Sequence, residues 1–209
     1  MLLEKVDSII FDLDGTMWDS SEQVLKVWKE VTSKSSDIKK EITLEELESV
    51  MGLQIKEIGE RFFPYLSKKR QEEILKECCD MECKYLKENG AKLYEELEKT
   101  LNLLMSKYKL FIVSNCGCGY IESFLEAHKL DKYFSDFENP GRTGLTKGEN
   151  IKVIISRNNL KSPIYVGDTQ GDRNAAREAG IPFVYASYGF GKVEDYDCKI
   201  SKFNDLLEL

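Results

Sequence analysis

Two aspartates in a short acidic segment, Asp12 and Asp14, are the side chains best placed to carry chemistry. They follow a largely apolar run, residues 6–11, whose β-branched residues predict a buried strand. In an open α/β sheet the ligand crevice lies outside the carboxyl ends of the strands, so both acids should face a ligand. Gly15 permits the chain to turn directly after them. Both side chains, or one side chain and one backbone carbonyl, could therefore meet at one point.

Two carboxylates held this close repel each other, and a divalent cation is the usual way to neutralise them. Oxygen ligands of this kind suit Mg²⁺. An alternative interpretation is a plain turn, in which Asp and Gly serve only the backbone. Further polar segments downstream, each at the end of a predicted strand or the start of a predicted helix, favour the chemical interpretation.

Ser114 and Asn115 form the first of these downstream segments, because they follow a second buried strand over residues 110–113. A helix is predicted over residues 120–128, so donors from the intervening backbone would lie near a helix N-terminus, where anions bind. A serine at the end of a strand is common, so this segment gains its weight only together with the others.

Lys147 stands near the start of an amphipathic helix, where the helix dipole disfavours a cation, so it requires an anionic partner. Asp168 and Asp172 follow another buried strand, residues 163–167, and open a helix that runs to Gly180. Their i, i+4 spacing brings both acids to one face at the helix start, where negative charge is favoured. These residues could meet Asp12 at one edge of the sheet.

The segment 11–16, FDLDGT, resembles the first motif of the haloacid dehalogenase-like (HAD) hydrolases, most of which are phosphatases. The resemblance implies that Asp12 is the nucleophile and Asp14 the general acid and base. Ser114 resembles the hydroxyl residue of the second motif, which implies that it binds phosphoryl oxygens together with Asn115 and nearby backbone N–H groups.

The remaining motifs of the family have counterparts here as well. Lys147 resembles the third-motif lysine, which implies catalytic and phosphate-binding roles, although Gly148 stands where family members often have proline. Asp168 and Asp172 resemble the fourth motif, GDxxxD. The resemblance implies a magnesium ion held by Asp12, Asp14 and Asp168, with Asp172 orienting a metal-bound water or Lys147.

The elements that position these residues are expected to form an α/β fold, a Rossmann-like parallel-sheet core with an inserted all-helical cap domain. Between the first two strands the sequence predicts only helices, and a single crossover usually needs just one helix. The resemblance therefore implies a helical cap at residues 17–89 and a catalytic core at 1–16 and 90–209. The remaining predicted elements are helices over 93–106 and 203–207, strands over 133–137 and 182–186, and a loop over 139–144.

The activity that this resemblance implies is a Mg²⁺-dependent phosphatase that hydrolyses a small phosphomonoester, phosphoglycolate-like or a sugar phosphate, through an aspartyl-phosphate. Alternatives are a phosphosugar mutase of the β-phosphoglucomutase type and a catalytically silent phosphate-binding protein. Such mutases carry basic residues around the glycine that corresponds to Gly52, whereas here Lys56 is the nearest cation, which favours hydrolysis. Gln54, Lys56 and Arg61 are the candidate specificity residues of the cap.

Composition restricts the partners. The 209-residue chain has a net charge of −7, which argues against a nucleic-acid partner because no basic surplus neutralises phosphates. Neither a signal peptide nor an 18-residue apolar run is recognisable, so we expect a cytoplasmic protein without a membrane partner, and most simply a monomer. The six cysteines are expected to be reduced thiols, and Cys116 and Cys118 lack the second pair that zinc sites normally have.

Overall fold

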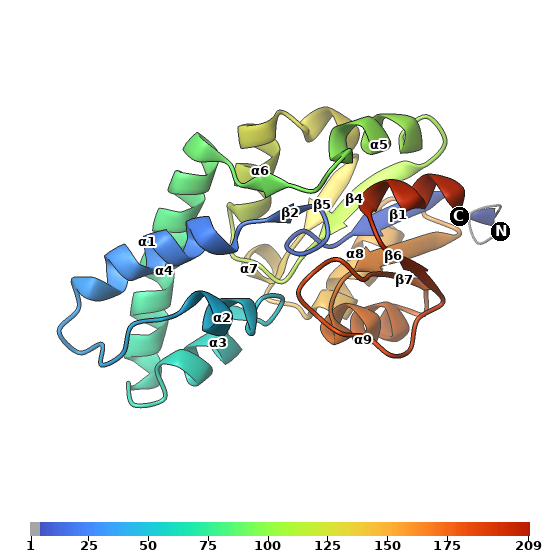
Figure 1. Ribbon diagram of the computed structural model, residues 1–209. Coiled ribbons are helices and arrows are strands. Elements are labelled where there is room, and N and C mark those ends of the chain that lie inside the picture. The colour runs from blue at the N-terminus through green and yellow to red at the C-terminus, as the bar shows by residue number, and fades with distance from the viewer. Residues whose placement is uncertain (1–4) are drawn as a thin grey trace.

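The computed structural model describes residues 5–209, which form a parallel sheet with helices on both faces (Figure 1). Its first strand lies in the middle of the sheet, and each neighbouring pair of strands is parallel, as the sequence predicts. In spatial order the strands are β5 (Asp136–Glu138), β4 (Lys109–Val113), β1 (Ser8–Phe11), β6 (Pro163–Gly167), β7 (Phe183–Ala186) and β8 (Cys198–Ile200).

Side chains of β1 alternate between two apolar cores, one on each face of the sheet. Ile9 and Phe11 pack into the core beneath one group of helices, and Ile10 packs into the core on the opposite face. Both cores exclude water and so fix the register of the strands. This register places the residues that follow each strand at one edge of the sheet. The helices are α5 (Leu97–Leu104), α6 (Tyr120–His128) and the 3₁₀ helix η3 (Phe203–Glu208) on the first face, and α8 (Lys147–Arg157) and α9 (Gln170–Ala179) on the second.

A group of helices between β1 and β4 lies together to one side of the sheet (Figure 1). Within this group α1 and α3 pack against α4, and α4 also packs against α6. Thr43 begins α2 with the capping box that its spacing to Glu46 predicts. The group consists of α1 (Ser21–Ser33), α2 (Leu44–Glu48), α3 (Ile55–Phe62) and α4 (Lys68–Asn89).

Two short strands mark where the chain leaves and re-enters the sheet region. β2 (Trp18–Asp19) and β3 (Lys92–Leu93) pair antiparallel, so both connections to the helical group run side by side. Neither strand was expected, because two residues are too few to give a sequence pattern. Their place explains why α5 begins at Leu97 rather than at residue 93.

Other boundaries differ from the sequence-based expectations around β5. The predicted strand over 133–137 instead begins at Asp136, because Asp131–Tyr133 forms the 3₁₀ helix η2 after α6 ends. The predicted loop over 139–144 contains the short helix α7 (Pro140–Thr143), capped by the side chain of Asn139. β8 was not predicted, and the terminal helix is a 3₁₀ helix. None of the helices within residues 5–209 combines the length and apolar character needed to cross a membrane.

Candidate active site

The carboxyl ends of three adjacent strands bring together polar residues that are far apart in sequence. Phe11 of β1 pairs with Ile112 of β4 on one side and with β6 on the other. Asp12, Ser114 and Asp168 follow these three strands directly, and all three are buried. This edge of the sheet is where the sequence places the ligand crevice.

Lys147 occupies the first position of α8, and its side chain is only 4% exposed. Its Nζ donates to Oδ1 of Asp12 at 2.7 Å and to Oδ1 of Asp172 at 2.6 Å. A cation is unfavourable at a helix start, and these two carboxylates offset that cost. The ammonium group therefore links the acid after β1 to the acid in the first turn of α9.

Asp12, Asp168 and Asp172 each offer a carboxylate oxygen within 4.8 Å of the others. Oδ2 of Asp168 accepts from the backbone N–H of Phe190 at 2.7 Å, while its Oδ1 is buried without a hydrogen-bond partner in residues 5–209. A Cβ atom at Gly15, which has a φ of +77°, would overlap this carboxylate. The glycine of the DLDG segment thus lets Asp168 approach the turn closely.

Asp172 has little capacity left for a further ligand. Its Oδ1 accepts from Lys147 and from the Tyr165 hydroxyl at 3.3 Å. Its Oδ2 accepts from the backbone N–H and the hydroxyl of Thr169, at 2.9 and 2.7 Å. Asp12, by contrast, has no hydrogen bond to Oδ2 from any described residue. The unpartnered oxygens of Asp12 and Asp168 are the ones that fit a hard divalent cation.

Asp14 lies apart from this acidic cluster. Its Oδ1 accepts from the Ser20 hydroxyl at 2.6 Å and from the Tyr120 hydroxyl at 2.9 Å. The side chain therefore points toward the helical group rather than toward Asp168. The sequence left open whether Asp14 would meet Asp12 through its side chain or through its backbone carbonyl. In this structure only the backbone carbonyl of Asp14 could do so. Burial raises the pKa of Asp14 to about 6, so its carboxyl group can carry a proton near neutral pH.

Burial and mutual repulsion favour the protonated form of the carboxyl groups in the acidic cluster. Burial, with the charge of Asp172, raises the pKa of Asp12 to about 7 against the opposing effect of Lys147. The pKa of Asp168 also rises well above its ordinary value, through burial and the charges of Asp172 and Asp12. Burial disfavours the charged form of Lys147, but Asp12 and Asp172 outweigh this effect and raise its pKa. Among the described residues Lys147 is the one cation bonded to these three carboxyl groups, so the cluster has room for further positive charge, as a cation-binding site would.

Asn115 connects the sheet edge to the helical group. Its Nδ2 donates to the backbone carbonyl of Gly52 at 2.9 Å, and its Oδ1 is buried without a partner in the described chain. The amide is thus engaged with the segment between α2 and α3, whereas Ser114 is buried at the end of β4. The two residues expected to bind phosphate lie in the same loop but contact different parts of the molecule.

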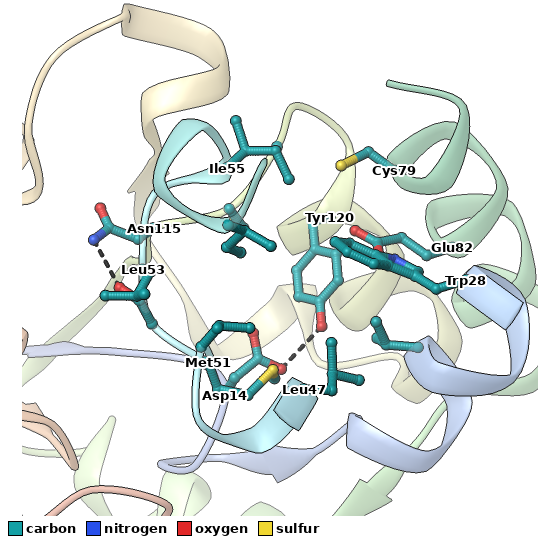
Figure 2. A pocket seen from close by; sticks show the side chains of 16 residues that line it. Asp14, Trp28, Leu47, Met51, Leu53, Ile55, Cys79, Glu82, Asn115 and Tyr120 are labelled. Carbon is teal, nitrogen blue, oxygen red and sulfur yellow. Dashed lines mark hydrogen bonds between the residues drawn. The ribbon is translucent and has the colours of Figure 1, made fainter. Parts of the chain in front are cut away.

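A cavity of about 60 Å³ lies between the helical group and the sheet edge, and Asp14 is part of its wall (Figure 2). Gln54 and Lys56, proposed from sequence as specificity residues, do not line it, whereas their neighbours Leu53 and Ile55 do. Lys56 is exposed. The full lining is Asp14, Val24, Trp28, Leu47, Val50, Met51, Gly52, Leu53, Ile55, Ile58, Cys79, Glu82, Asn115, Cys116, Gly117 and Tyr120.

Three cavity residues escaped the sequence reasoning: Trp28, Glu82 and Tyr120. For Glu82 a signal was present, because it stands four residues after Cys78 and four before Leu86, both buried in α4. An acid in the apolar stripe of a helix is a reason to expect a function. Trp28 and Tyr120 gave no such signal, since aromatic residues in helices usually serve the core.

The parallel sheet, with acids after its strands and a buried lysine at a helix start beside them, defines an α/β protein whose candidate active site lies at this edge. Comparison with known families agrees: the family model described as haloacid dehalogenase-like hydrolase matches residues 9–186. The chain belongs to this family.

Curated relatives and solved structures are consistent with this membership. A phosphoglycolate phosphatase from Aquifex aeolicus is 29% identical over 96% of this chain and 95% of its own length. A phosphoglycolate phosphatase from Escherichia coli is 25% identical over 98% of this chain and 92% of its own length. A haloacid dehalogenase-like hydrolase from Streptococcus pneumoniae superposes with a TM-score of 0.82 at 22% identity, covering 97% of each chain, and shares the fold.

Proposed function

We propose that this protein is a Mg²⁺-dependent phosphatase that hydrolyses a small phosphomonoester through an aspartyl-phosphate on Asp12. The observation that carries the proposal is the buried Lys147 bridging Asp12 and Asp172 beside the unpartnered Oδ1 of Asp168. A purely structural ion pair would not need a third buried carboxylate with an open oxygen.

Asp12 and Asp168 would hold the metal, with the Asp14 backbone carbonyl as a further oxygen ligand. Magnesium would supply positive charge that neutralises the phosphoryl oxygens and keeps Asp12 ionised at neutral pH. Asp172 has its oxygens engaged by Lys147 and Thr169, which supports an orienting role. Lys147 would neutralise charge on the phosphoryl group while holding Asp12 in place.

The reaction would proceed in two displacements at phosphorus. In the first, an oxygen of Asp12 forms a bond to phosphorus, the ester P–O bond breaks, and Asp14 gives its proton to the leaving alkoxide. In the second, Asp14 takes a proton from water, the water oxygen attacks phosphorus, and the bond to Asp12 breaks to release phosphate. The raised pKa of Asp14, about 6, suits an acid that becomes a base.

The helices α1–α4 are proposed to form a cap domain over residues 17–89, with the core at 1–16 and 90–209. The pairing of β2 with β3 at both connections supports a hinge there. We propose that the protein acts as a monomer. The six free cysteines support a reducing compartment such as the cytoplasm.

The substrate is proposed to be a small phosphorylated metabolite. Two curated relatives are named phosphoglycolate phosphatases, which supports the phosphomonoester class. A mutase remains the second candidate because it shares the nucleophile and the general acid. The cavity is small and lacks a basic side chain among its lining residues, which supports hydrolysis because a mutase must also hold a second phosphate.

The test is Mg²⁺-dependent phosphate release from a panel of small phosphomonoesters by the unmodified protein and by Asp12→Asn. We expect release to need the metal and to fall at least about a thousandfold in Asp12→Asn, because the variant cannot form the acyl phosphate. Asp80→Asn, the same change at an exposed position of α4, should leave release unchanged.

Mass spectrometry of quenched reactions should find the added phosphoryl group on the peptide that contains Asp12. Isomerised sugar phosphate without net phosphate release would identify a mutase. Absence of turnover with every ester, in a folded protein that binds Mg²⁺, would refute the enzymatic proposal.

A further inference from the structure

The cavity beside Asp14 has an acidic lining, because it holds the carboxyl groups of Asp14 and Glu82 and no basic side chain. Its aromatic donors are already engaged: the Trp28 indole N–H donates to Oε2 of Glu82, and the Tyr120 hydroxyl donates to Asp14. One N–H of the Asn115 amide donates to the backbone carbonyl of Gly52, which also lines the cavity. The two carboxyl groups therefore favour a ligand that brings donors of its own.

Glu82 is the buried acid of this cavity, and one of its oxygens already accepts from Trp28. The residue is 6% exposed, and no described lysine, arginine or histidine forms an ion pair with it. Burial raises its pKa to about 7, with a further contribution from the charge of Asp14. Figure 2 shows the Glu82 carboxylate beside the Trp28 ring, on the same side of the cavity as Tyr120.

A carboxylate in a largely apolar cavity is a suitable environment for an ammonium group. The carboxylate supplies charge, and the aromatic and aliphatic side chains around it keep the space desolvated. By contrast, a ligand carboxylate or second phosphate would face Asp14 and Glu82 across a low-dielectric cavity with no compensating cation. Both would be rejected by like-charge repulsion.

Cavity size restricts the ligand further. One water needs about 10–15 Å³ on this measure, so about 60 Å³ accommodates an organic group of only a few non-hydrogen atoms. Leu47, Met51, Leu53 and Ile55 contribute apolar walls, which suit a short aliphatic carbon chain. Asp14 and Glu82 line the same cavity, so a chain that begins at an ester oxygen beside Asp14 extends into the space that Glu82 borders.

We infer that the preferred substrates are phosphomonoesters of short amino alcohols, whose ammonium group binds to Glu82 beside Trp28 and Tyr120. This inference rests on the proposed phosphatase function and names its substrate class. In this inference Glu82 selects the substrate and takes no part in phosphoryl transfer. Phosphoglycolate, whose carboxylate would occupy the same place, is correspondingly a poor substrate.

The experiment compares kcat/KM for three esters of similar size: O-phosphoethanolamine, propyl phosphate and phosphoglycolate. Propyl phosphate replaces the ammonium group with a methyl group of similar volume. We expect O-phosphoethanolamine to exceed propyl phosphate by about tenfold or more, since one charge contact worth about 1.4 kcal/mol gives this ratio. Phosphoglycolate should rank last.

Glu82→Gln keeps the acceptor for Trp28 but removes the charge, so the ratio of O-phosphoethanolamine to propyl phosphate should fall to near one. Both esters are measured in each variant, because a damaged site lowers both values of kcat/KM alike, whereas lost selection lowers only their ratio. Glu77→Gln, the same change on the exposed face of α4, should keep the ratio of the unmodified protein.

Binding to the Asp12→Asn protein, measured by calorimetry with Mg²⁺ present, gives the same comparison without turnover. If no ester is hydrolysed, the phosphatase proposal fails, yet a preference for O-phosphoethanolamine that Glu82→Gln abolishes still supports the inference. Equal or weaker binding and turnover of O-phosphoethanolamine relative to propyl phosphate or phosphoglycolate would overturn it, even with hydrolysis established.

Discussion

Glu82 shows how one buried acid links the stability of this protein to pH. Burial raises its pKa from the ordinary 4.5 to about 7, so between these values the native state keeps a proton that the unfolded chain has lost. The native state binds more protons in this range, so the free energy of unfolding contributed by Glu82 falls as pH rises. A pKa difference of one is worth about 1.36 kcal/mol, which makes the total loss roughly 3 kcal/mol.

Glu82→Gln should therefore gain stability relative to the unmodified protein as pH rises. We expect the difference in unfolding free energy between the two proteins to shift by roughly 2–3 kcal/mol in favour of Gln from about pH 5 to about pH 8. Urea unfolding at several pH values, without ligand, measures this. Glu77→Gln, which is exposed, should follow the unmodified protein at each pH. Parallel curves for Glu82→Gln and Glu77→Gln would contradict the raised pKa of Glu82 in the ligand-free protein.

Individual site residues differ in how far the sequence could predict them. Asp12, Lys147 and Asp168 stand at strand ends and a helix start, positions where physical rules and a known motif agree. Glu82 and Tyr120 come from α4 and α6, which meet through tertiary packing that no local sequence pattern specifies. The partners of Asp14 were beyond prediction for the same reason, because Tyr120 lies 106 residues away in the chain.

Among the elements, the segment between α2 and α3 decides how the helical group meets the sheet. Gly52 in this segment has a φ of +81°, accepts from Asn115, and lies so near Thr169 that a Cβ atom would contact its methyl group at 3.3 Å. An alanine there would combine backbone strain with a tight contact to the N-cap of α9. The closed arrangement over the cavity should weaken.

Gly52→Ala should raise KM for the preferred ester several-fold with a smaller change in kcat, because the cavity closes less well around the alcohol part. Steady-state kinetics measures this effect. Gly180→Ala provides the matched control, since its φ is +73° and no atom lies within 4 Å of its added Cβ. Both variants should lose about 1–2 kcal/mol of stability from the left-handed conformation. An unchanged KM in Gly52→Ala would refute a role for this segment in closure.

Element existence was predictable where apolar periodicity or capping residues were strong, as in the capping box at Thr43 and the strand before Asp168. Predicted element boundaries were wrong where pairing with another strand, rather than the local sequence pattern, sets the boundary. β5 begins at Asp136 because its residues pair with β4 from Phe111 onward, and β8 owes its three residues to pairing with β7. The loop predicted at 139–144 was wrong because Asn139 and Pro140 favour a helix start as well as a turn.

Across the whole molecule, the buried acidic cluster costs stability that a bound cation would return. Asp12, Asp168 and Asp172 lie together in a buried site with Lys147 as the one cation that bonds to them in the described chain. Repulsion and burial raise the pKa of Asp168 well above its ordinary value, so the fold without metal carries an unfavourable charge. A ligand that binds only to the native state raises the free energy of unfolding by mass action and so offsets this cost.

Saturating Mg²⁺ should therefore raise the melting temperature. At a metal concentration of about 100 times Kd the gain is about 2.7 kcal/mol, or roughly 5–10 °C for a chain of this size. Asp168→Asn should lose most of this rise, yet melt higher than the unmodified protein without metal, because the substitution removes a buried charge. Differential scanning calorimetry with and without Mg²⁺ measures both effects, and Asp80→Asn, at an exposed position, should behave like the unmodified protein in each. A full Mg²⁺ response in Asp168→Asn, or a lower metal-free melting temperature than the unmodified protein, would show that this carboxylate holds the fold rather than the ion.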